Sequence, residues 1–325
     1  MNTIKMKTYW YPVCRSREVR RRPIPKTLLG IGLVLVRYDN TLVCFENRCP
    51  HRGVPLSGGK VHECRLRCNY HGWSFDSEGE LVSLPGVPDP QESARLNKKT
   101  CRESNGIVWV RLEGDRKFED PFGVPERGFG EKGMFKYMRS DYIHSIENFL
   151  DPTHTPFIHE GLVRSSGRQM MRVWQSSSER GFETHYHLED RQNGLVNTLF
   201  DSGIDTNIAT FRMPGFAKLE YLKREKLQLR VSIFFVPIEI GTVGMLVRVY
   251  VPKRGFPTAM IFLILRPFLE IAFFQDRKIL ETHWKFRQRY GDLNKIMEAD
   301  LVIDHLLHLI AEKENGKNKE MTMIL

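Results

Sequence analysis

The first third of the chain alternates short runs of β-branched residues with turn-forming residues. The runs GLVLVRY (32–38), TLVCFEN (41–47) and GIVWVRL (106–112) are bounded by Gly, Asn and Asp. Runs of this length and composition predict β-strands. Residues 113–133 are polar and rich in Gly and Pro, which predicts a linker. The pattern therefore predicts an all-β domain over residues 1–115.

Beyond the linker the pattern changes to a mixture of helix and strand. A helical segment is expected near 141–160, and strand-like runs fill 170–251, notably LQLRVSIFFVP and TVGMLVRVYVP. Two further helical stretches are expected at about 258–290 and 292–313. This order predicts an α+β fold, in which a second, larger domain covers residues 116–325.

The composition is that of an ordinary globular protein. Of 325 residues, 41% are hydrophobic and 27% are charged, which argues against wholesale disorder. The longest apolar run, AMIFLIL at 259–265, is shorter than the roughly 20 residues that span a bilayer. The N-terminal segment lacks the apolar stretch of a signal peptide. We therefore expect a cytoplasmic protein without a membrane span.

The formal net charge is +10, and the segment RSREVRRRPIPK at 15–26 carries a local excess of basic residues. No nucleic-acid recognition motif accompanies this excess, so nucleic acid is not expected as a partner. A solvated loop is the simpler interpretation of the segment. A docking face for an acidic redox partner is the alternative.

The most informative stretch is CPHRGVPLSGGKVHECRLRCNYHGW, residues 49–73. Each end contributes one thiol and one imidazole, Cys49 with His51 and Cys68 with His71. Thiolates and imidazoles suit zinc or iron–sulfur centres. A structural zinc finger usually pairs Cys with Cys and His with His, whereas the mixed pairing here favours a two-iron cluster with different ligands on each iron.

The segments C-P-H-R-G and C-N-Y-H-G-W, separated as they are here, resemble the Rieske [2Fe–2S] motif of ring-hydroxylating oxygenases. The resemblance implies that the two Cys–His pairs bind such a cluster. Imidazole ligands raise its reduction potential to roughly −150 to +300 mV, so that it accepts an electron readily and passes it on. His62 and Cys64 lie in the same stretch but are not needed to complete the set of four ligands.

A second group of candidate ligands lies in ENFLDPTHTPFIH, residues 147–159. Asp151 and His154 are three residues apart and would share a helix face. His159 is about 140° out of line with His154 on an ideal helix, but the intervening Pro156 should bend or break the helix. Two His and one carboxylate form the facial triad of non-haem Fe(II) oxygenases. From these residues alone, Asp151 could be that carboxylate or could support a ligand.

The pattern D-x-x-H-x-x-x-x-H resembles the mononuclear-iron motif of Rieske oxygenase α subunits, whose third ligand is a distant Asp in a C-terminal helix. The segment FFQDRKILE, residues 273–281, resembles that helix. The resemblance therefore implies that His154, His159 and Asp276 bind Fe(II).

The same resemblance gives two more residues a catalytic role. Asp151 would connect to the cluster ligand His71 of the neighbouring subunit in a head-to-tail homotrimer, as carboxylates often support metal-bound imidazoles. Asn148, just upstream, would lie near the iron.

The resemblance implies an all-β Rieske domain followed by a helix-grip (START-like) catalytic domain, in which a curved antiparallel sheet wraps a long helix. It implies a terminal oxygenase that uses O2 to hydroxylate or demethylate an apolar, aromatic small molecule. A separate NAD(P)H-dependent reductase or ferredoxin must supply electrons, because the chain has no Gly-rich nucleotide-binding motif. The alternatives are a Rieske-type electron carrier without oxygenase activity and a zinc-stabilised binding module.

Overall fold

The computed structural model describes residues 3–87, 93–123, 127–162, 170–188, 203–253, 255–293, 295–310 and 319–324. The chain forms two compact units. One comprises residues 2–120 with 236–240, and the other comprises residues 121–235 with 241–325. The two-domain division with a boundary at residue 115 stays a prediction.

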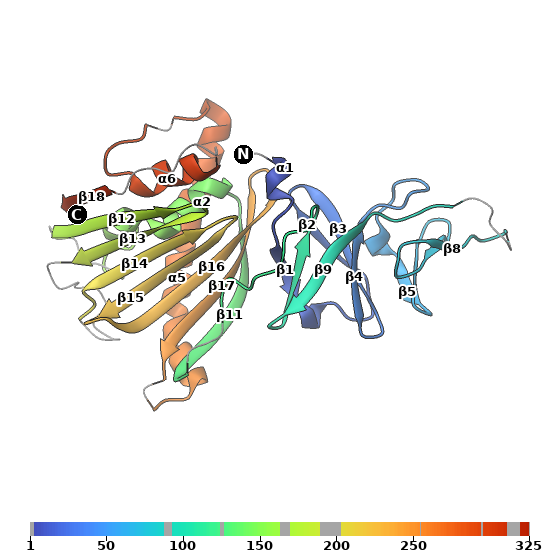
Figure 1. Cartoon of the computed structure of the whole chain (residues 1–325), viewed down its shortest axis with the longest axis horizontal. Coiled ribbons are helices and arrows are strands. Elements are labelled where there is room, and N and C mark those ends of the chain that lie inside the picture. The colour runs from blue at the N-terminus through green and yellow to red at the C-terminus, as the bar shows by residue number, and fades with distance from the viewer. Residues whose placement is uncertain are drawn as a thin grey trace. The chain divides into compact units, whose positions relative to one another are not determined.

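The first unit contains two antiparallel sheets, as expected for an all-β domain (Figure 1). The six-stranded sheet has the order β1-β10-β9-β4-β3-β2, and the four-stranded sheet has the order β5-β6-β7-β8. The described helices of this unit are single turns. The bounds are α1 Thr3–Met6, β1 Tyr11–Arg15, η1 Ser16–Glu18, β2 Ile24–Leu28, β3 Ile31–Tyr38, β4 Thr41–Glu46, η2 Leu56–Gly58, β5 Lys60–His62, β6 Arg65–Arg67, β7 Ser74–Phe75, β8 Leu81–Ser83, β9 Lys98–Ser104 and β10 Ile107–Arg111.

One hydrophobic core joins these strands to the candidate cluster ligands. Val34 and Phe45, from β3 and β4, are fully buried in the same cluster as Phe75 from β7. Cys49 and Cys68 belong to this cluster and are only 2% and 3% exposed. The packing of the β-branched and aromatic runs therefore fixes the place where the two thiols lie.

The second unit is built on an eight-stranded sheet with the order β11-β17-β16-β15-β14-β13-β12-β18 (Figure 1). Its strands are β11 Phe129–Met138, β12 Met170–Ser178, β13 Gly181–Leu188, β14 Thr206–Arg212, β15 Phe216–Lys223, β16 Lys226–Glu239, β17 Thr242–Pro252 and β18 Lys319–Ile324. Two predictions need correction. The predicted linker 113–133 runs into β11, and the sequence analysis did not anticipate β18, which pairs with β12.

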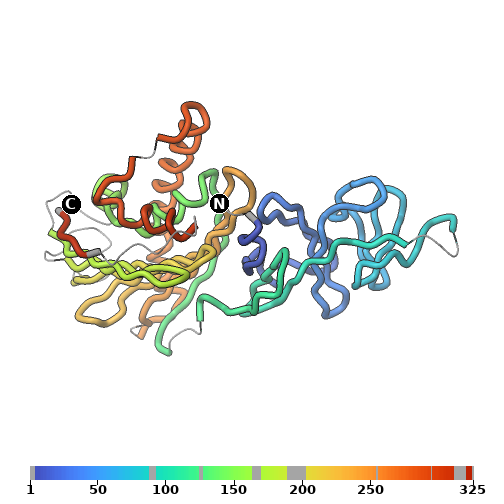
Figure 2. Tube along the Cα trace, turned by 45° about the horizontal axis from the view of Figure 1, so that its top comes forward, coloured from blue at the N-terminus to red at the C-terminus, as the bar shows by residue number. Residues whose placement is uncertain are grey.

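The helices of this unit are α2 (Tyr142–Leu150), η3 (Pro152–His154), α3 (Thr155–Ile158), α5 (Thr258–Tyr290) and α6 (Leu301–Ile310). The helix α2 packs against α5 and α6, and Figure 2 follows these segments along the trace. The prediction for α5 is confirmed. The helix expected at 292–313 covers only residues 301–310 of the described chain.

The segment predicted as one helix near 141–160 is divided at Asp151, not at Pro156 as expected. Asp151 has extended backbone angles, φ −89° and ψ 114°. The following Pro152 disfavours helical geometry for the residue before it, which ends α2 there. Pro156 instead lies in the first turn of α3, where a proline is tolerated because no helical N–H is lost.

The long helix α5 buries one side and exposes the other. Phe262 and Leu265 pack against Val249 and Val251 of β17, whereas Leu263 is 75% exposed. Of the described helices, α5 alone is long and apolar enough to cross a membrane by length and composition. A core helix can pass the same test, so the expected absence of a membrane span stays a prediction.

The start of α2 provides a test of local stability. Asp141 accepts hydrogen bonds from the amides of Ile143 at 2.9 Å and His144 at 3.3 Å, and its other carboxylate oxygen lies 3.0 Å from Arg287. Burial opposes the charge, but His144 and Arg287 outweigh it and lower the pKa of Asp141 to about 2. We expect Asp141→Ala to lower the free energy of unfolding by about 1–2 kcal/mol.

The loss should be at least as large at pH 5 as at pH 7. The carboxylate contributes fully above its unfolded pKa of roughly 3.9, and Asp141 also raises the pKa of His144, a contribution that is complete only below the unfolded His pKa of roughly 6.5. Urea unfolding followed by circular dichroism measures it. Asp141→Asn keeps the helix cap and should recover most of the loss. Equal unfolding midpoints for Asp141→Ala and the wild type would show that neither the cap nor the ion pair stabilises α2.

Candidate active site

The four candidate cluster ligands lie on two short loops of the first unit. The amide of Cys49 donates to the carbonyl of Val54 at 2.9 Å, and the amide of Cys68 donates to the carbonyl of Trp73 at 2.8 Å. Each loop thus closes over six residues and presents one Cys and one His. Gly59, between the loops, allows a close approach, since a Cβ there would lie 2.3 Å from a backbone oxygen of Arg67.

The residues on these loops suit a two-iron cluster. The thiols of Cys49 and Cys68 are close enough to hydrogen-bond to each other, and burial is the main reason that the pKa of Cys49 is raised. The rings of His51 and His71 are 4.6 Å apart, and His51 stacks on Trp73 at 4.5 Å. The donors therefore form a buried pair of thiols and a neighbouring pair of imidazoles, the set that a Rieske cluster requires.

The two residues left out of the ligand set lie on the β5–β6 hairpin, between the two loops. His62 ends β5 and Cys64 lies in the turn, at the end of the ladder away from Cys68. Cys64 is exposed and its thiol donates to Asp39 at 3.2 Å. Their position supports leaving both out of the cluster.

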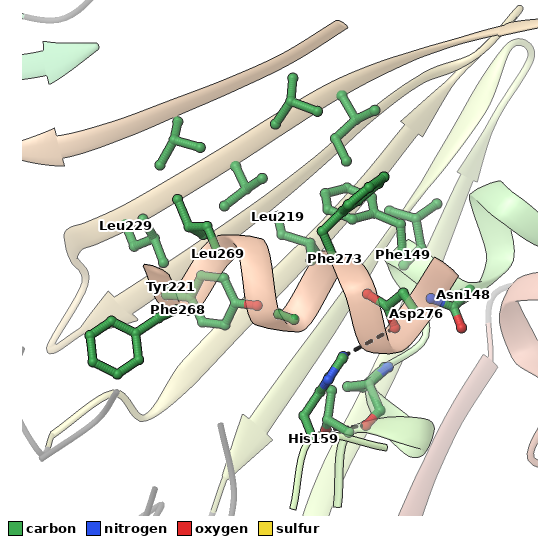
Figure 3. Close-up of a pocket in the computed structure, with 18 of the residues that line it drawn as sticks. Asn148, Phe149, His159, Leu219, Tyr221, Leu229, Phe268, Leu269, Phe273 and Asp276 are labelled. Atoms are coloured by element: carbon green, nitrogen blue, oxygen red, sulfur yellow. Dashed lines mark hydrogen bonds and ion pairs between the residues drawn. The ribbon is translucent and has the colours of Figure 1, made fainter. Parts of the chain in front are cut away.

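In the second unit, three distant side chains meet at one point. The Nε2 atoms of His154 and His159 lie 3.5 Å and 3.1 Å from Oδ1 of Asp276 (Figure 3 labels His159 and Asp276). One ligand atom from each residue lies within 4.8 Å of the others. A metal ion bound at about 2.1 Å from each donor would hold neighbouring donors roughly 3 Å apart, so this arrangement fits one ion.

Local backbone structure explains how these residues face one another. Asp151 caps η3, and its side chain accepts hydrogen bonds from the amide of Thr153 at 2.9 Å and its hydroxyl at 2.6 Å. His154 ends η3, and His159 follows the single-turn helix α3. The break in the helix thus turns both imidazoles toward α5, which carries Asp276.

The electrostatic environment leaves these donors available to a metal. Burial lowers the pKa of His154, which keeps its imidazole neutral. Burial also opposes charge on His159, but the hydrogen bond and charge of Asp276 outweigh it and raise the pKa of His159. Oδ1 of Asp276 is buried and faces the Nε2 atoms of both imidazoles, where a bound cation would compensate its charge. Nδ1 of His154 is buried and has no hydrogen-bond partner within the described part of the chain.

Gln275 was not identified from the sequence, although it precedes Asp276. Its Oε1 lies 2.9 Å from Nδ1 of His159. An Nδ1–H that donates to this oxygen fixes the ring and leaves Nε2 free to bind a metal. The one signal in the sequence was its place next to Asp276. An amide residue next to a metal ligand is too common a pattern to indicate a role.

We expect Gln275→Leu to weaken iron binding about 10- to 100-fold, because the imidazole of His159 loses its orienting partner. Titration of the iron-depleted mononuclear site with Fe(II), followed by iron analysis, measures the effect. Lys278→Ala, an exposed change on the same helix, is the control. An unchanged affinity in the Gln275 variant would mean that this contact does not orient His159.

A cavity of about 240 Å³ lies beside the three side chains. Its wall is mainly apolar, and Figure 3 shows Phe268, Leu269 and Phe273 of α5 opposite side chains from the sheet. Asn148, which was expected near the iron, and Asp151, which was expected to connect to a neighbouring subunit, also line it. A largely apolar cavity with a few polar groups at one end is typical of a binding site for a small organic molecule.

Comparison with known proteins agrees with this architecture. Residues 9–97 match the Rieske [2Fe-2S] domain family, and residues 138–306 match the vanillate O-demethylase oxygenase C-terminal domain family. The second match covers more than half of the chain. The chain belongs to the Rieske non-haem iron oxygenases. The predicted fold class is confirmed, and the predicted cofactors, a [2Fe–2S] cluster and mononuclear Fe(II), are those of this family.

Individual relatives resemble this Rieske oxygenase to different extents. Methylxanthine N1-demethylase NdmA from Pseudomonas putida is 24% identical over 86% of the chain and 81% of its own length. Protein TIC 55 from the chloroplast of Arabidopsis thaliana is 35% identical, over 53% of the chain and 35% of its own length. The chain spans between 31% and 49% of the length of TIC 55 and four other curated relatives.

Among solved structures, dicamba monooxygenase bound to 3,6-dichlorosalicylic acid superposes with a TM-score of 0.80. It is 17% identical in sequence, and the match covers 94% of this Rieske oxygenase and 97% of that chain. At this identity the likeness concerns the fold.

Proposed function

We propose that this protein is the terminal oxygenase component of a system that uses O2 to hydroxylate or demethylate an apolar, aromatic small molecule. The observation that carries the proposal is the convergence of His154, His159 and Asp276 at the wall of an apolar cavity. A chain that also contains a Rieske domain combines an electron carrier with a site for oxygen chemistry. An electron carrier alone would not need such a cavity.

The assignment of ligands follows from the donor sets. Cys49 and Cys68 would hold one iron of the cluster, and His51 and His71 the other. His154, His159 and Asp276 would hold Fe(II). When bound, the cluster supplies single electrons and the mononuclear Fe(II), with open coordination positions, supplies reaction with O2.

The protein itself contributes orientation and exclusion of water. Phe268 and Phe273 from α5 and Leu219 from β15 form apolar walls that favour a flat, apolar molecule over water. Gln275 holds the ring of His159 in place. Asn148, at the same end of the cavity as the candidate ligands, would contact the reacting part of the bound molecule (Figure 3). The substrate is thereby held against the metal side of the cavity.

Relatives guide the choice of reaction. NdmA is a methylxanthine N1-demethylase, and another relative from Pseudomonas is the oxygenase subunit of vanillate O-demethylase. Both names describe demethylation of a ring-bearing compound, so an N- or O-methylated aromatic molecule is the first substrate to try. The expected partners are an NAD(P)H-dependent reductase or a ferredoxin, and the expected location is the cytoplasm.

Asp151 supports a homotrimer in this proposal, in which it would bond to His71 of the neighbouring subunit. Within one chain its carboxylate bonds to Thr153, and burial raises its pKa. We expect Asp151→Ala to lower substrate turnover about 10- to 100-fold while both metal centres survive. Iron content, the cluster spectrum and product formation measure this.

Asp151→Asn is the matched control for that variant, because an Asn can still cap η3. If Asp151→Asn also loses turnover, the charge matters rather than the local fold. Near-normal turnover in Asp151→Ala would show that the connection between subunits does not depend on this residue.

The proposed function is tested by anaerobic iron and sulfide analysis with EPR on the dithionite-reduced protein. We expect iron for one [2Fe–2S] cluster plus one further ion, and a Rieske-type signal. Addition of a methoxylated aromatic substrate, a reductase and O2 should then give product. Cluster iron alone, without further Fe(II) uptake when iron is supplied, would instead identify an electron carrier.

A further inference from the structure

Three side chains from neighbouring strands form a row across the sheet side of the cavity. Asn207 on β14 is paired in register with Tyr186 on β13 and with Tyr221 on β15. Directly paired residues of antiparallel strands project from the same face of a sheet. All three side chains line the cavity, and Figure 3 labels Tyr221 there. Asn207 is thus the amide at the centre of an aromatic row.

The carboxamide of Asn207 is buried with one end unsatisfied. The residue is 5% exposed, and its Oδ1 has no hydrogen-bond partner among the residues that the structure describes. The hydroxyl of Tyr186, in contrast, donates to the carbonyl of Leu150 at 3.4 Å. Buried polar groups are nearly always hydrogen-bonded, because an unmade bond leaves their loss of water uncompensated. The missing partner of Asn207 is therefore expected in the molecule that fills the cavity.

The cation on the cavity wall is already paired. Among the described residues that line the cavity, Lys136 is the one Lys or Arg, and its ammonium forms an ion pair with Glu270, which also lines the cavity. The same ammonium lies 5.0 Å from the ring centre of Phe273. A carboxylate ligand that turned to Lys136 would have to compete with Glu270 for this cation, and the carboxylates of Asp151 and Asp276 on the same wall add to the unfavourable charge.

We propose that Asn207 determines specificity in this cavity, and that the substrate is an uncharged aromatic molecule with one hydrogen-bonding group, an amide or a hydroxyl, directed at β14. The inference rests on the proposed function for its assumption that the cavity binds substrate, and it adds the chemical class. Because the unsatisfied atom of Asn207 is the acceptor Oδ1, an N–H of a neutral amide or an O–H of a hydroxyl on the substrate would donate to it.

Three probes that differ in one substituent test this proposal on the intact holoprotein. They are 4-methoxybenzamide, 4-methylanisole and 4-methoxybenzoate, which carry an amide, a methyl and a carboxylate on the same ring. Isothermal titration calorimetry without reductase gives the three dissociation constants. We expect the amide to bind about 10- to 100-fold more tightly than the methyl compound, and the carboxylate to bind no better than the methyl compound.

Asn207→Leu should remove the preference for the amide and leave the affinity for 4-methylanisole within about threefold, since shape is nearly retained. The control is Thr210→Val on the same strand, whose hydroxyl donates to Glu183 rather than lining the cavity. It should keep the preference. Equal iron content and circular dichroism spectra confirm that each variant is folded.

Glu270→Gln tests the pairing of Lys136 separately. The change frees Lys136, so 4-methoxybenzoate should gain about tenfold in affinity while 4-methoxybenzamide changes little. An unchanged amide preference in Asn207→Leu, tight carboxylate binding by the wild type, or no saturable binding of any probe would each overturn the proposal. Because binding is measured without turnover, an amide preference in a protein that consumes no O2 would contradict the proposed function and leave this inference standing.

Discussion

Asp276→Ala is expected to remove the mononuclear iron and to lower substrate turnover by at least about a thousandfold, while the Rieske cluster remains intact. The carboxylate lies 3.1 Å and 3.5 Å from the two imidazole nitrogens, so its loss leaves two neutral donors to bind the ion. A bound metal contributes several kcal/mol of transition-state stabilisation, which corresponds to this loss in rate. Iron analysis, EPR of the reduced cluster and product formation measure the three parts of the expectation.

Glu281→Ala is the matched control, because it removes another carboxylate from the same helix. Glu281 pairs with Arg277 at 2.8 Å, one helical turn away, and exposed pairs of this kind contribute little to stability. This variant should keep its iron and its turnover. Full iron content and normal turnover in Asp276→Ala would show that α5 does not supply the third ligand, and that the convergence of the three side chains is a structural ion pair.

His71→Ala is expected to lose the iron of the cluster, whereas Asp276→Ala loses the mononuclear iron. Removing one of four cluster ligands should abolish the [2Fe–2S] cluster, its visible absorbance and substrate turnover together, since no electron can then reach the mononuclear site. The mononuclear site should still take up Fe(II) in a binding titration. Iron and sulfide analysis before and after supply of Fe(II) separates the two centres.

A second histidine of the same domain provides the control for that variant. The side chain of His62 is 71% exposed, and it lies at the far end of the β5–β6 ladder from Cys68. His62→Ala should leave the cluster spectrum unchanged. Survival of the cluster in His71→Ala, or its loss in His62→Ala, would mean that the assignment of imidazoles on this hairpin is wrong.

These two variants together distinguish the proposed oxygenase from an electron carrier. In an oxygenase, both variants lose turnover but lose different iron atoms. In an electron carrier, Asp276→Ala would leave electron transfer unaffected, and the apolar cavity beside Asp276 would have no substrate to bind. The comparison therefore requires only iron content, one spectrum and one assay of product.

Features that depend on residues close together in the chain could be predicted from the sequence. The strands around residues 32–47 and 106–112 followed from local composition and are present as β3, β4 and β10. The two Cys–His pairs were recognisable because each pair lies within one loop, and each loop closes over six residues by its own backbone hydrogen bond. Short loops of this kind carry their geometry in their sequence.

Local patterns were less reliable where two signals competed. The helix around 141–160 was expected to break at Pro156, yet it breaks at Asp151 because Pro152 acts on the residue before it. The polar and Gly-rich run 113–133 was expected to be a linker, but its end is drawn into β11 by pairing with β17. In both cases the boundary of the helix or strand depended on a strand contact or a steric effect that composition does not reveal.

The surroundings of the mononuclear site could not be predicted without the packed fold. Asp276 is more than a hundred residues from His159, and spacing could not place it; the family resemblance indicated it, and the packing of α5 over the sheet brings the two within 3.1 Å. Gln275 and Asn207 had no recognisable pattern at all. Gln275 meets His159 from a distant segment, and Asn207 lies between residues of two neighbouring strands. Such long-range contacts depend on how the helix and the whole sheet pack.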